Sequence, residues 1–317
     1  MRIIFFGSGA FGLPTLAALH RDHEIIAVVS QPDRPAGRGR AVTPTPIAQW
    51  AIEEGLPLHQ MENVNDDDAV TLLRSIDAQA WVVVAFGQML SPQLLSRRFA
   101  INLHASLLPR HRGASPIHHA ILSGDQESGV TVISLAKQLD VGQMYARAST
   151  PIAPGETAGE LHDRLAELGP SAVESVLKGL ADDTLEPTPQ REGEATTAGK
   201  LSPSEVVLPL SEPASVVAAY INGLSPWPSV SVSVCGRKIK LLRAIETPPQ
   251  GDEEEGNVAP PQGDEEEGNV TPGGVLTCGS GTCTVLDVQP AGKRPMSWSD
   301  FANGLERGVP WTIEISA

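Results

Sequence analysis

The sequence of 317 residues contains no long hydrophobic run, and its longest apolar stretch covers only residues 80–86. A helix that crosses a membrane needs roughly 20 consecutive apolar residues. The opening residues 1–7 turn at a glycine after four apolar residues, which indicates a strand and not a secretory signal. We therefore expect no membrane segment, no membrane partner and a cytoplasmic location.

Cysteine is scarce as well, and the residues that bind metals are not arranged as ligands. The three cysteines, Cys235, Cys278 and Cys283, are too few for a disulfide framework and match no zinc spacing. His104 and His111 are seven residues apart across a loop rich in proline and glycine, and no H-E-x-x-H motif occurs. A G-x-S-x-G nucleophile motif is also absent. The sequence predicts neither a metal site nor a covalent nucleophile.

Acidic residues outnumber basic ones, but the excess is concentrated in one place. The net charge is −15, and the segment 248–258 recurs as 260–270, each copy with four acidic residues and no base. The remaining chain therefore carries −7, and its basic residues form clusters. The repeat, residues 248–270, is flanked by proline and glycine and poor in apolar residues, so we expect a solvated loop. Local charge clusters, and not the total, decide whether a polyanion can bind.

In the first half of the chain, apolar strands alternate with helical patterns, which predicts a doubly wound parallel sheet. A long helix is expected over residues 157–180, with a possible break at Gly169-Pro170. The expected strands are residues 2–7, 24–30, 81–86, 100–103 and 130–135. Ligands of such sheets bind outside the carboxyl ends of the strands.

After residue 183 the composition of the chain changes. Residues 184–203 are polar and contain Pro187 and Pro189, which is typical of a linker. The following segment, residues 204–317, holds one helix and several short strands with glycine turns, which favours a small β-barrel. The predicted organisation is an α/β domain at 1–183, a linker at 184–203 and a smaller β-barrel domain at 204–317.

The turn Gly7-Ser8-Gly9-Ala10-Phe11-Gly12 fits the G-x-G-x-x-G pattern of dinucleotide-binding proteins, in which glycines let a pyrophosphate approach a helix. Asp33 lies at a suitable distance, although it sits in a proline-flanked turn. The alternative is that the glycines only allow a tight turn and close packing of helix on strand. This segment alone leaves both interpretations open.

Asn102 and His104 are two residues apart on a predicted strand, so they share one face near its carboxyl end. An amide can donate to an oxyanion and an imidazole can move a proton, the two requirements of acyl transfer. Asp140, after the next strand, is expected to reach the same sheet edge. Taken separately, these residues could also be a cap, a satisfied histidine and a turn residue.

The stretch from Asn102 to Pro116, which contains Ser106-Leu107-Leu108-Pro109-Arg110-His111-Arg112-Gly113, resembles the signature of formyltransferases that use 10-formyltetrahydrofolate, and Leu139-Asp140-Val141-Gly142 resembles their second catalytic stretch. Three further stretches, residues 31–40, 225–228 and 289–297, are similar to the methionyl-tRNA formyltransferase branch of that family. The resemblance extends over residues 1 to about 310.

Membership of this family implies a Rossmann-like first domain, an OB-like barrel that contacts tRNA, and a glycine turn that binds no dinucleotide. It implies formyl transfer from 10-formyltetrahydrofolate to the α-amino group of initiator methionyl-tRNA by a monomer without a metal. The implied catalytic residues are Asn102, His104 and Asp140. The implied folate-binding residues are Ser106, Leu107, Leu108, Pro109, Phe86, Gly87, Gln88 and Met89. The implied tRNA-binding residues are Arg34, Arg38, Arg40, Lys238, Lys240 and Lys293.

Three other functions are considered at this stage. A sugar-nucleotide formyltransferase would share the chemistry but need a nucleotide pocket. A dinucleotide-binding oxidoreductase would use residues 7–12 and leave residues 102–113 unexplained. An inactive tRNA-binding protein would have no use for three catalytic side chains.

Overall fold

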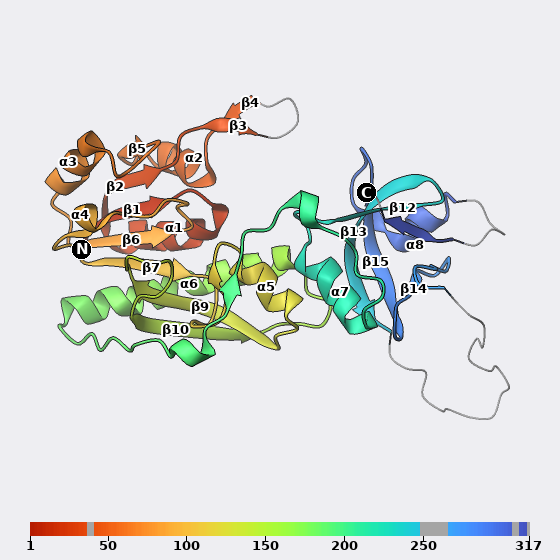
Figure 1. The fold of residues 1–317 in the computed structure, drawn as a ribbon. Coiled ribbons are helices and arrows are strands. Elements are labelled where there is room, and N and C mark those ends of the chain that lie inside the picture. The colour runs from red at the N-terminus through yellow and green to blue at the C-terminus, as the bar shows by residue number, and fades with distance from the viewer. Residues whose placement is uncertain (37–40, 248–265, 306–310, 316–317) are drawn as a thin grey trace. The chain divides into compact units, whose positions relative to one another are not determined.

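The computed structural model describes residues 1–36, 41–247, 266–305 and 311–315. Contacts divide the chain into two compact units (Figure 1). Unit 1 comprises residues 1–116, 127–150 and 162–199, and unit 2 comprises residues 117–126, 151–161 and 200–317. Two short segments that lie between stretches of unit 1 in the sequence therefore belong to unit 2.

Unit 1 is built on a seven-stranded sheet with the order β10-β9-β7-β6-β1-β2-β5. Neighbouring strands from β7 to β5 are parallel. The seven strands of the whole sheet are β1 (Arg2–Gly7), β2 (Glu24–Ser30), β5 (Leu58–Gln60), β6 (Ala80–Val84), β7 (Ala100–His104), β9 (Glu127–Ser134) and β10 (Met144–Pro151). The strands predicted at residues 2–7 and 24–30 have the predicted bounds.

Helices cover both faces of this sheet, as a doubly wound fold requires. Ile4 and Phe6 of β1 pack in one buried cluster with Leu73 and Leu94 from α3 and α4. Phe5 points to the other face, where a Cβ added to Gly12 would lie 3.3 Å from its ring. The helices of unit 1 are η1 (Ala10–Gly12), α1 (Leu13–Asp22), α2 (Pro46–Glu53), α3 (Asp67–Ser75), α4 (Pro92–Leu95) and, from residue 162 on, α6 (Ala158–Ala181). Helix α5 (Pro116–Leu122) belongs to unit 2 except for its first residue.

One strand departs from the predicted parallel arrangement. β9 runs antiparallel to β7, with Thr131 opposite His104 and Ser134 opposite Ile101. The loop after β9 therefore starts beside the beginning of β7, and not at the carboxyl edge that the sequence suggested for Asp140. The antiparallel direction follows from the connection between the two strands. Residues 105–126 leave β7 at its carboxyl edge and enter β9 at that same edge, because this short segment does not cross to the opposite edge of the sheet.

The predicted break in the long helix is also wrong, because α6 continues through Pro170. Proline removes one backbone donor, which a helix can tolerate when packing compensates. Here Gly169 lets the helix approach both α1 and β7 closely, since a Cβ at this position would lie 2.5 Å from Thr15 Oγ1 and 2.7 Å from Leu103 Cδ2. Among the described residues, no helix has both the length and the apolar character to cross a membrane.

Unit 2 contains a curled antiparallel sheet, the half-barrel that the sequence predicted as OB-like. Register shifts around Arg243 bend the longest pair of strands. The buried amide of Asn222 donates to Ala244 O at 2.7 Å and accepts from Ala244 N at 2.9 Å, which attaches helix α7 (Ala214–Gly223) to the bend. The sheet elements are β12 (Val230–Val234), β13 (Arg237–Glu246), β14 (Val275–Thr277), β15 (Thr282–Pro290), β16 (Met296–Ser297) and β17 (Ile313–Ile315), followed between β16 and β17 by α8 (Trp298–Ala302).

Most of the duplicated acidic segment, residues 248–265, lies outside the described residues. The end of its second copy is described and is not the solvated loop that we predicted. Asn269 and Val270 form bridges with Thr312 and Leu276, and Val270 is buried in the core of unit 2. The backbone of this valine pairs with a strand and its side chain buries apolar surface, which stabilises an ordered conformation despite the polar residues before it.

The sequence patterns did not predict several short elements. The antiparallel pair of β3 (Arg34–Ala36) and β4 (Ala41–Thr43) begins in the proline-flanked turn predicted around Asp33 and extends beyond it. A second small sheet joins β8 (Arg112–Gly113) to β11 (Thr197–Ala198), in parallel. The remaining short helices are η2 (Glu192–Glu194) and η3 (Pro203–Glu205).

We predict that Gly129→Ala destabilises unit 1. A Cβ at Gly129 would lie 2.1 Å from Ala148 O and 2.6 Å from Leu107 Cδ2, so β9 and β10 would have to move apart. Overpacking of this kind costs about 1–3 kcal/mol, or about 2–4 °C of melting temperature per kcal/mol. Thermal unfolding measures the effect, with Gly193→Ala as the control because no atom lies within 4 Å of a Cβ there. Equal melting temperatures for both variants would contradict the packing argument.

Candidate active site

The carboxyl ends of β6 and β7 lie side by side, with Val84 opposite Leu103. The segments 85–90 and 105–113 therefore leave the sheet at the same edge. Asn102 and His104 project from one face of β7, about 7 Å apart along the strand. This edge gathers the two segments that the sequence analysis assigned to the folate and the chemistry.

His104 is buried, with 6% of its surface exposed, and both ring nitrogens face polar groups. Nε2 lies 2.9 Å from the backbone oxygen of His111. A carbonyl oxygen can only accept, so Nε2 carries a proton and donates it. Nδ1 faces Asp140 Oδ2 at 3.5 Å, which is longer than an ordinary hydrogen bond. In the neutral ring, Nδ1 is therefore the nitrogen able to accept a proton.

The loop of residues 135–143 returns to β7 and brings Asp140 to His104. Asp140 is 8% exposed and adopts a left-handed backbone, with φ of 55°. Its Oδ2 accepts from Gly113 N at 2.9 Å. A Cβ at Gly142 would lie 1.7 Å from Ser134 O, so the loop closes against the end of β9 only with glycine there. The structure thus joins two of the three predicted catalytic side chains by direct contact.

Burial, the largest influence, lowers the pKa of His104 below its ordinary value of 6.5. The negative charge of Asp140 acts in the opposite direction and raises it, as does the hydrogen bond to His111 O. Because burial prevails, the ring is neutral near pH 7. A neutral imidazole beside a carboxylate can take up a proton released nearby.

Asn102 is half-buried, and its side-chain amide makes no hydrogen bond to another of the described residues. Its backbone pairs with Val83 and Ile133 on either side, so the position of its side chain is set by the sheet. An amide held in this way keeps both N–H donors available for a ligand oxygen.

The residues assigned to the folate form two loops of different character. Ser106 Oγ donates to Arg110 O at 2.6 Å, while Thr131 Oγ1 links Ser106 O and Leu108 N at 2.7 and 3.1 Å. Ser106, Leu108 and Pro109 are buried, and Leu107 is half-buried. This loop is therefore held by internal hydrogen bonds before any ligand arrives.

In the second loop, the side chains face in different directions. Phe86 is buried against Phe6, and its backbone oxygen accepts from Ser8 Oγ and Gln31 Nε2. Gln88 bonds internally to Met61 O and Val64 N. Gly87 and Met89 are exposed. The parts of this loop that face outward are backbone and the Met89 side chain.

The glycine turn at residues 7–12 does not present its amides to a ligand. Ser8 N and Gly9 N donate to Ala85 O at 3.3 and 3.2 Å. A Cβ at Gly7 would lie 2.6 Å from the Phe5 ring, so this glycine is needed for close packing. Of the two interpretations left open, the structure supports tight packing and not pyrophosphate binding.

Sequence reasoning missed the contribution of residues 188–198, which it assigned to a linker. Thr196 Oγ1 accepts from His111 N at 2.8 Å, and Gln190 donates to Asp140 O at 2.7 Å. β11 pairs with β8, where a Cβ at Gly113 would lie 2.3 Å from Ala198 O. A polar segment with two prolines has no periodicity that could reveal such contacts.

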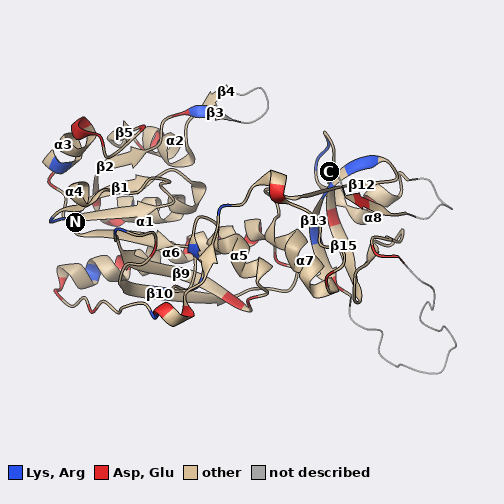
Figure 2. Cartoon of the chain, in the orientation of Figure 1, with Lys and Arg blue, Asp and Glu red and all other residues tan. Residues whose placement is uncertain are grey.

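Lys and Arg occur in both units (Figure 2), and the sequence positions of the residues assigned to tRNA divide them between unit 1 and unit 2. Arg34 is exposed on β3 and pairs with Glu62, whereas Arg38 and Arg40 lie outside the described residues. Lys238 and Lys240 alternate on β13, opposite Ser233 and Ser231 of β12. Lys293 is exposed in the turn that bonds to Lys238 O through Ala291 N. Unit 2 therefore presents three lysines close together on one strand and its neighbouring turn.

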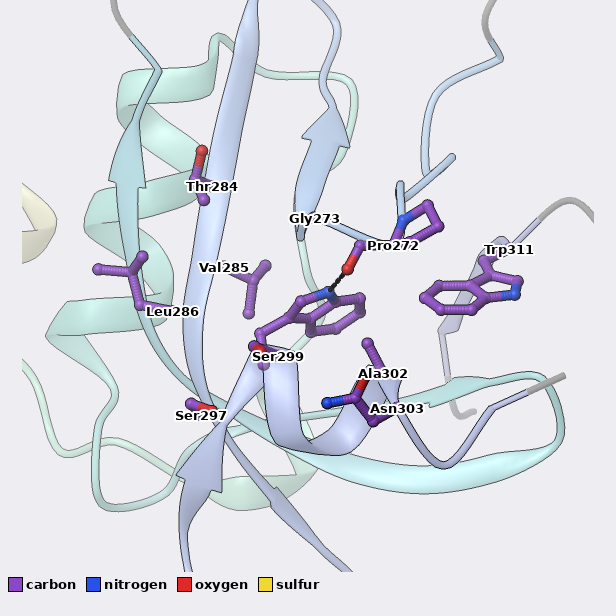
Figure 3. A pocket seen from close by; sticks show the side chains of 11 residues that line it. Pro272, Gly273, Thr284, Val285, Leu286, Ser297, Ser299, Ala302, Asn303 and Trp311 are labelled. Atoms are coloured by element: carbon purple, nitrogen blue, oxygen red, sulfur yellow. Dashed lines mark hydrogen bonds between the residues drawn. The ribbon is translucent and has the colours of Figure 1, made fainter. Parts of the chain in front are cut away.

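A pocket of about 650 Å³ lies in unit 2 (Figure 3), and none of the predicted site residues lines it. Trp298 Nε1 donates to Pro272 O at 3.1 Å, and the ring of Trp311 faces the same space. No charged side chain is among its described lining residues. Within the described ranges, no group of three His, Cys, Asp or Glu side chains is arranged to hold a metal ion.

We predict that Asp140→Asn lowers the pKa of His104 further. The aspartate charge raises this pKa, so its removal leaves burial unopposed. Because the unfolded chain binds a proton at His104 below about pH 6.5 and the folded chain does not, this residue also destabilises the fold as the pH falls through that value. NMR titration of the histidines measures the effect, with the His104 signal assigned by its loss in His104→Asn. A pKa that rises in Asp140→Asn would contradict the assignment.

Comparison with known proteins identifies the family over most of the chain. The pattern of the family described as "Formyl transferase" matches residues 1–177, and that of "Formyl transferase, C-terminal domain" matches residues 200–306. Solved structures with the same fold include the sugar 3N-formyl transferase WlaRD, at a TM-score of 0.65 and 14% identity over 93% of this chain and 99% of that one. HypX from Aquifex aeolicus has a TM-score of 0.63 at 16% identity, over 98% of this chain and 50% of its own.

Sequence relatives are much closer. The methionyl-tRNA formyltransferase of Moorella thermoacetica is 40% identical over 307 residues, which is 96% of each chain. That of Methylococcus capsulatus is 40% identical over 306 residues, again 96% of each chain. The chain therefore belongs to the methionyl-tRNA formyltransferase family.

Proposed function

We propose that this protein transfers the formyl group of 10-formyltetrahydrofolate to the α-amino group of initiator methionyl-tRNA, for the initiation of translation. The contact of His104 with Asp140 beside the free amide of Asn102 carries the proposal, because it gathers the groups that formyl transfer needs. Full-length similarity to enzymes named for this reaction supports the substrate. We further propose that the enzyme acts as a monomer in the cytoplasm.

In this reaction, the amine nitrogen attacks the formyl carbon attached to N10 of the folate. An α-amino group has a pKa near 8, so a useful fraction is unprotonated at neutral pH. A carbon–nitrogen bond forms, and the carbonyl oxygen becomes an oxyanion. Asn102 donates to that oxygen from a position that the sheet holds in place, which requires little reorganisation during the reaction.

The proton lost by the amine must reach N10 before the old carbon–nitrogen bond breaks. Nε2 of His104 is committed to His111 O, so Nδ1 is the atom that receives the proton. Asp140 stabilises the resulting imidazolium from 3.5 Å. The ring then returns the proton to N10, and the products are the formylated amine and tetrahydrofolate. No covalent enzyme intermediate is required.

The folate is proposed to bind along residues 106–109 and 86–89. The first segment is pre-ordered by Thr131 and Arg110, so binding loses little conformational freedom there. In the second, Met89 is 46% exposed and can close on an apolar ring, while the backbone of Gly87 is exposed to a ligand.

The tRNA is proposed to contact Arg34 on β3, Arg38 and Arg40, and also Lys238, Lys240 and Lys293 in unit 2. Basic side chains alternating on one strand can follow phosphates and set position without reading bases. Arg243, three residues after Lys240, instead forms ion pairs with Glu160 and Asp287 within unit 2.

Replacement of each catalytic residue tests the chemistry. Asn102→Ala is expected to lower kcat about 10²–10³-fold, the usual cost of one oxyanion donor. His104→Ala and Asp140→Ala are expected to lower it about 10²–10⁴-fold, through lost proton transfer. Steady-state assays with methionyl-tRNA and 10-formyltetrahydrofolate give these values. Near-normal turnover of Asp140→Ala would show that the three residues do not act together.

Removal of two lysines tests the surface of unit 2. The double variant Lys238→Ala/Lys240→Ala is expected to raise KM for tRNA and to lower the slope of log affinity against log salt by about 2, with KM for the folate unchanged. The control is Arg21→Ala/Lys178→Ala, which removes the same charge from exposed positions on α1 and α6. If both variants change KM for tRNA equally, only net charge matters and this surface is not the binding site.

A further inference from the structure

The backbone conformation of Asp140 is unfavourable by itself and has to be stabilised by neighbouring groups. A non-glycine residue at φ of 55° pays roughly 1 kcal/mol or more relative to a right-handed conformation, although aspartate tolerates it better than most. The direction of its carboxylate depends on that backbone, because the side chain leaves the same Cα. Whatever holds the backbone of Asp140 therefore also sets where the carboxylate lies relative to His104.

One side chain holds this backbone from the segment predicted as a linker. Gln190 Nε2 donates to Asp140 O at 2.7 Å and to Gly142 O at 2.8 Å. A primary amide has two hydrogens, and here both are used on carbonyl groups two residues apart. The amide thus spans Val141 and bonds to the loop on either side of it.

The orientation of the Gln190 amide is itself determined. Arg112 Nε donates to Gln190 Oε1 at 2.9 Å, so the oxygen faces the arginine and the nitrogen faces the loop. The two terminal nitrogens of Arg112 bind the carboxylate of Glu192 at 2.9 and 2.8 Å. Only 12% of the Arg112 side chain is exposed, so this forked pair is well shielded on the arginine side.

These bonds form a closed circuit through the active site. Arg112 precedes Gly113, whose N–H donates to the carboxylate of Asp140. Arg112 also reaches Gln190, which donates to the carbonyl of Asp140. The backbone and the side chain of Asp140 are therefore held from the same short strand, β8, by two separate routes.

We propose that Gln190 is a positioning residue, which holds the backbone of Asp140 so that its carboxylate faces Nδ1 of His104, with Arg112 orienting the Gln190 amide. The inference rests on the catalytic role proposed above for Asp140. Misplacement of a reacting group by about 1 Å can cost as much as 10²-fold in rate, so a clamp on the loop affects turnover without touching the substrate.

Replacement of Gln190 by leucine removes both donors while the side chain keeps a similar size. Gln190→Leu is expected to lower kcat about 10–10²-fold, with KM for the folate and for tRNA within about twofold of wild type. Gln143→Leu is the matched control. It lies in the same loop, is exposed, and its side chain makes no hydrogen bond to another of the described residues. Wild-type kcat in folded Gln190→Leu would overturn the proposal.

A second variant separates positioning from folding. Gln190→Glu keeps the shape and the bond to Arg112 but places acceptors against the carbonyls of Asp140 and Gly142. Its kcat is expected to fall as far as that of Gln190→Leu, while its melting temperature and circular dichroism stay those of a folded protein. A folded Gln190→Glu with unchanged kcat would overturn the proposal even if the leucine variant failed to fold.

A double-mutant cycle with Asp140→Asn tests whether Gln190 acts through the aspartate. Single-turnover rates are compared for Asp140→Asn with and without Gln190→Leu, and no further loss is expected when both are present. Equal losses in both backgrounds would show a general structural role and refute positioning. Full activity of Asp140→Asn alone would instead remove the proposed role of Asp140. A slow Asp140→Asn together with a normal Gln190→Leu would reject only this inference.

Discussion

The hydrogen bond between Nε2 of His104 and the backbone oxygen of His111 determines how the rest of the site can work. It assigns one ring nitrogen as a donor and turns the other toward Asp140. Burial then keeps the ring neutral, because a charged imidazole would lose its hydration without full compensation. A base that is neutral, oriented and next to a carboxylate is the arrangement that moving a proton between two nitrogens requires. The geometry of one backbone carbonyl thus decides which ring nitrogen of His104 is left able to accept a proton.

The segments that form this site come together only where backbones can touch. Gly113 lies against Ala198 O and Gly142 against Ser134 O, at separations that leave no room for a Cβ. Glycine is needed at these two positions for proximity and not merely for flexibility. The same principle explains the turn at residues 7–12, where glycine serves packing against Phe5 and Ala85 and resembles a nucleotide motif only in its sequence.

Charge in this protein has to be considered by location. The total of −15 suggests a poor partner for RNA, yet Lys238, Lys240 and Lys293 are gathered on one strand and the adjacent turn. Arg243, only three residues from Lys240, is instead held by two carboxylates inside unit 2. Basic residues that are close in sequence therefore lie in different surroundings, and only the pairing of each side chain distinguishes them. Nearby charges dominate because salt screens the interaction between exposed charges that are more than about 10 Å apart.

The amino-acid sequence by itself determined the class of fold and indicated which residues are candidates for the site. Alternation of period two placed Asn102 and His104 on one face, and the buried apolar runs identified the central strands, because these patterns are local. The antiparallel direction of β9, the route by which Asp140 reaches His104, and the uninterrupted α6 were decided by tertiary structure. So were the bonds of Gln190, which lies 50 residues from Asp140. No local pattern encodes such a contact, since it exists only when two distant segments pack against the same strand.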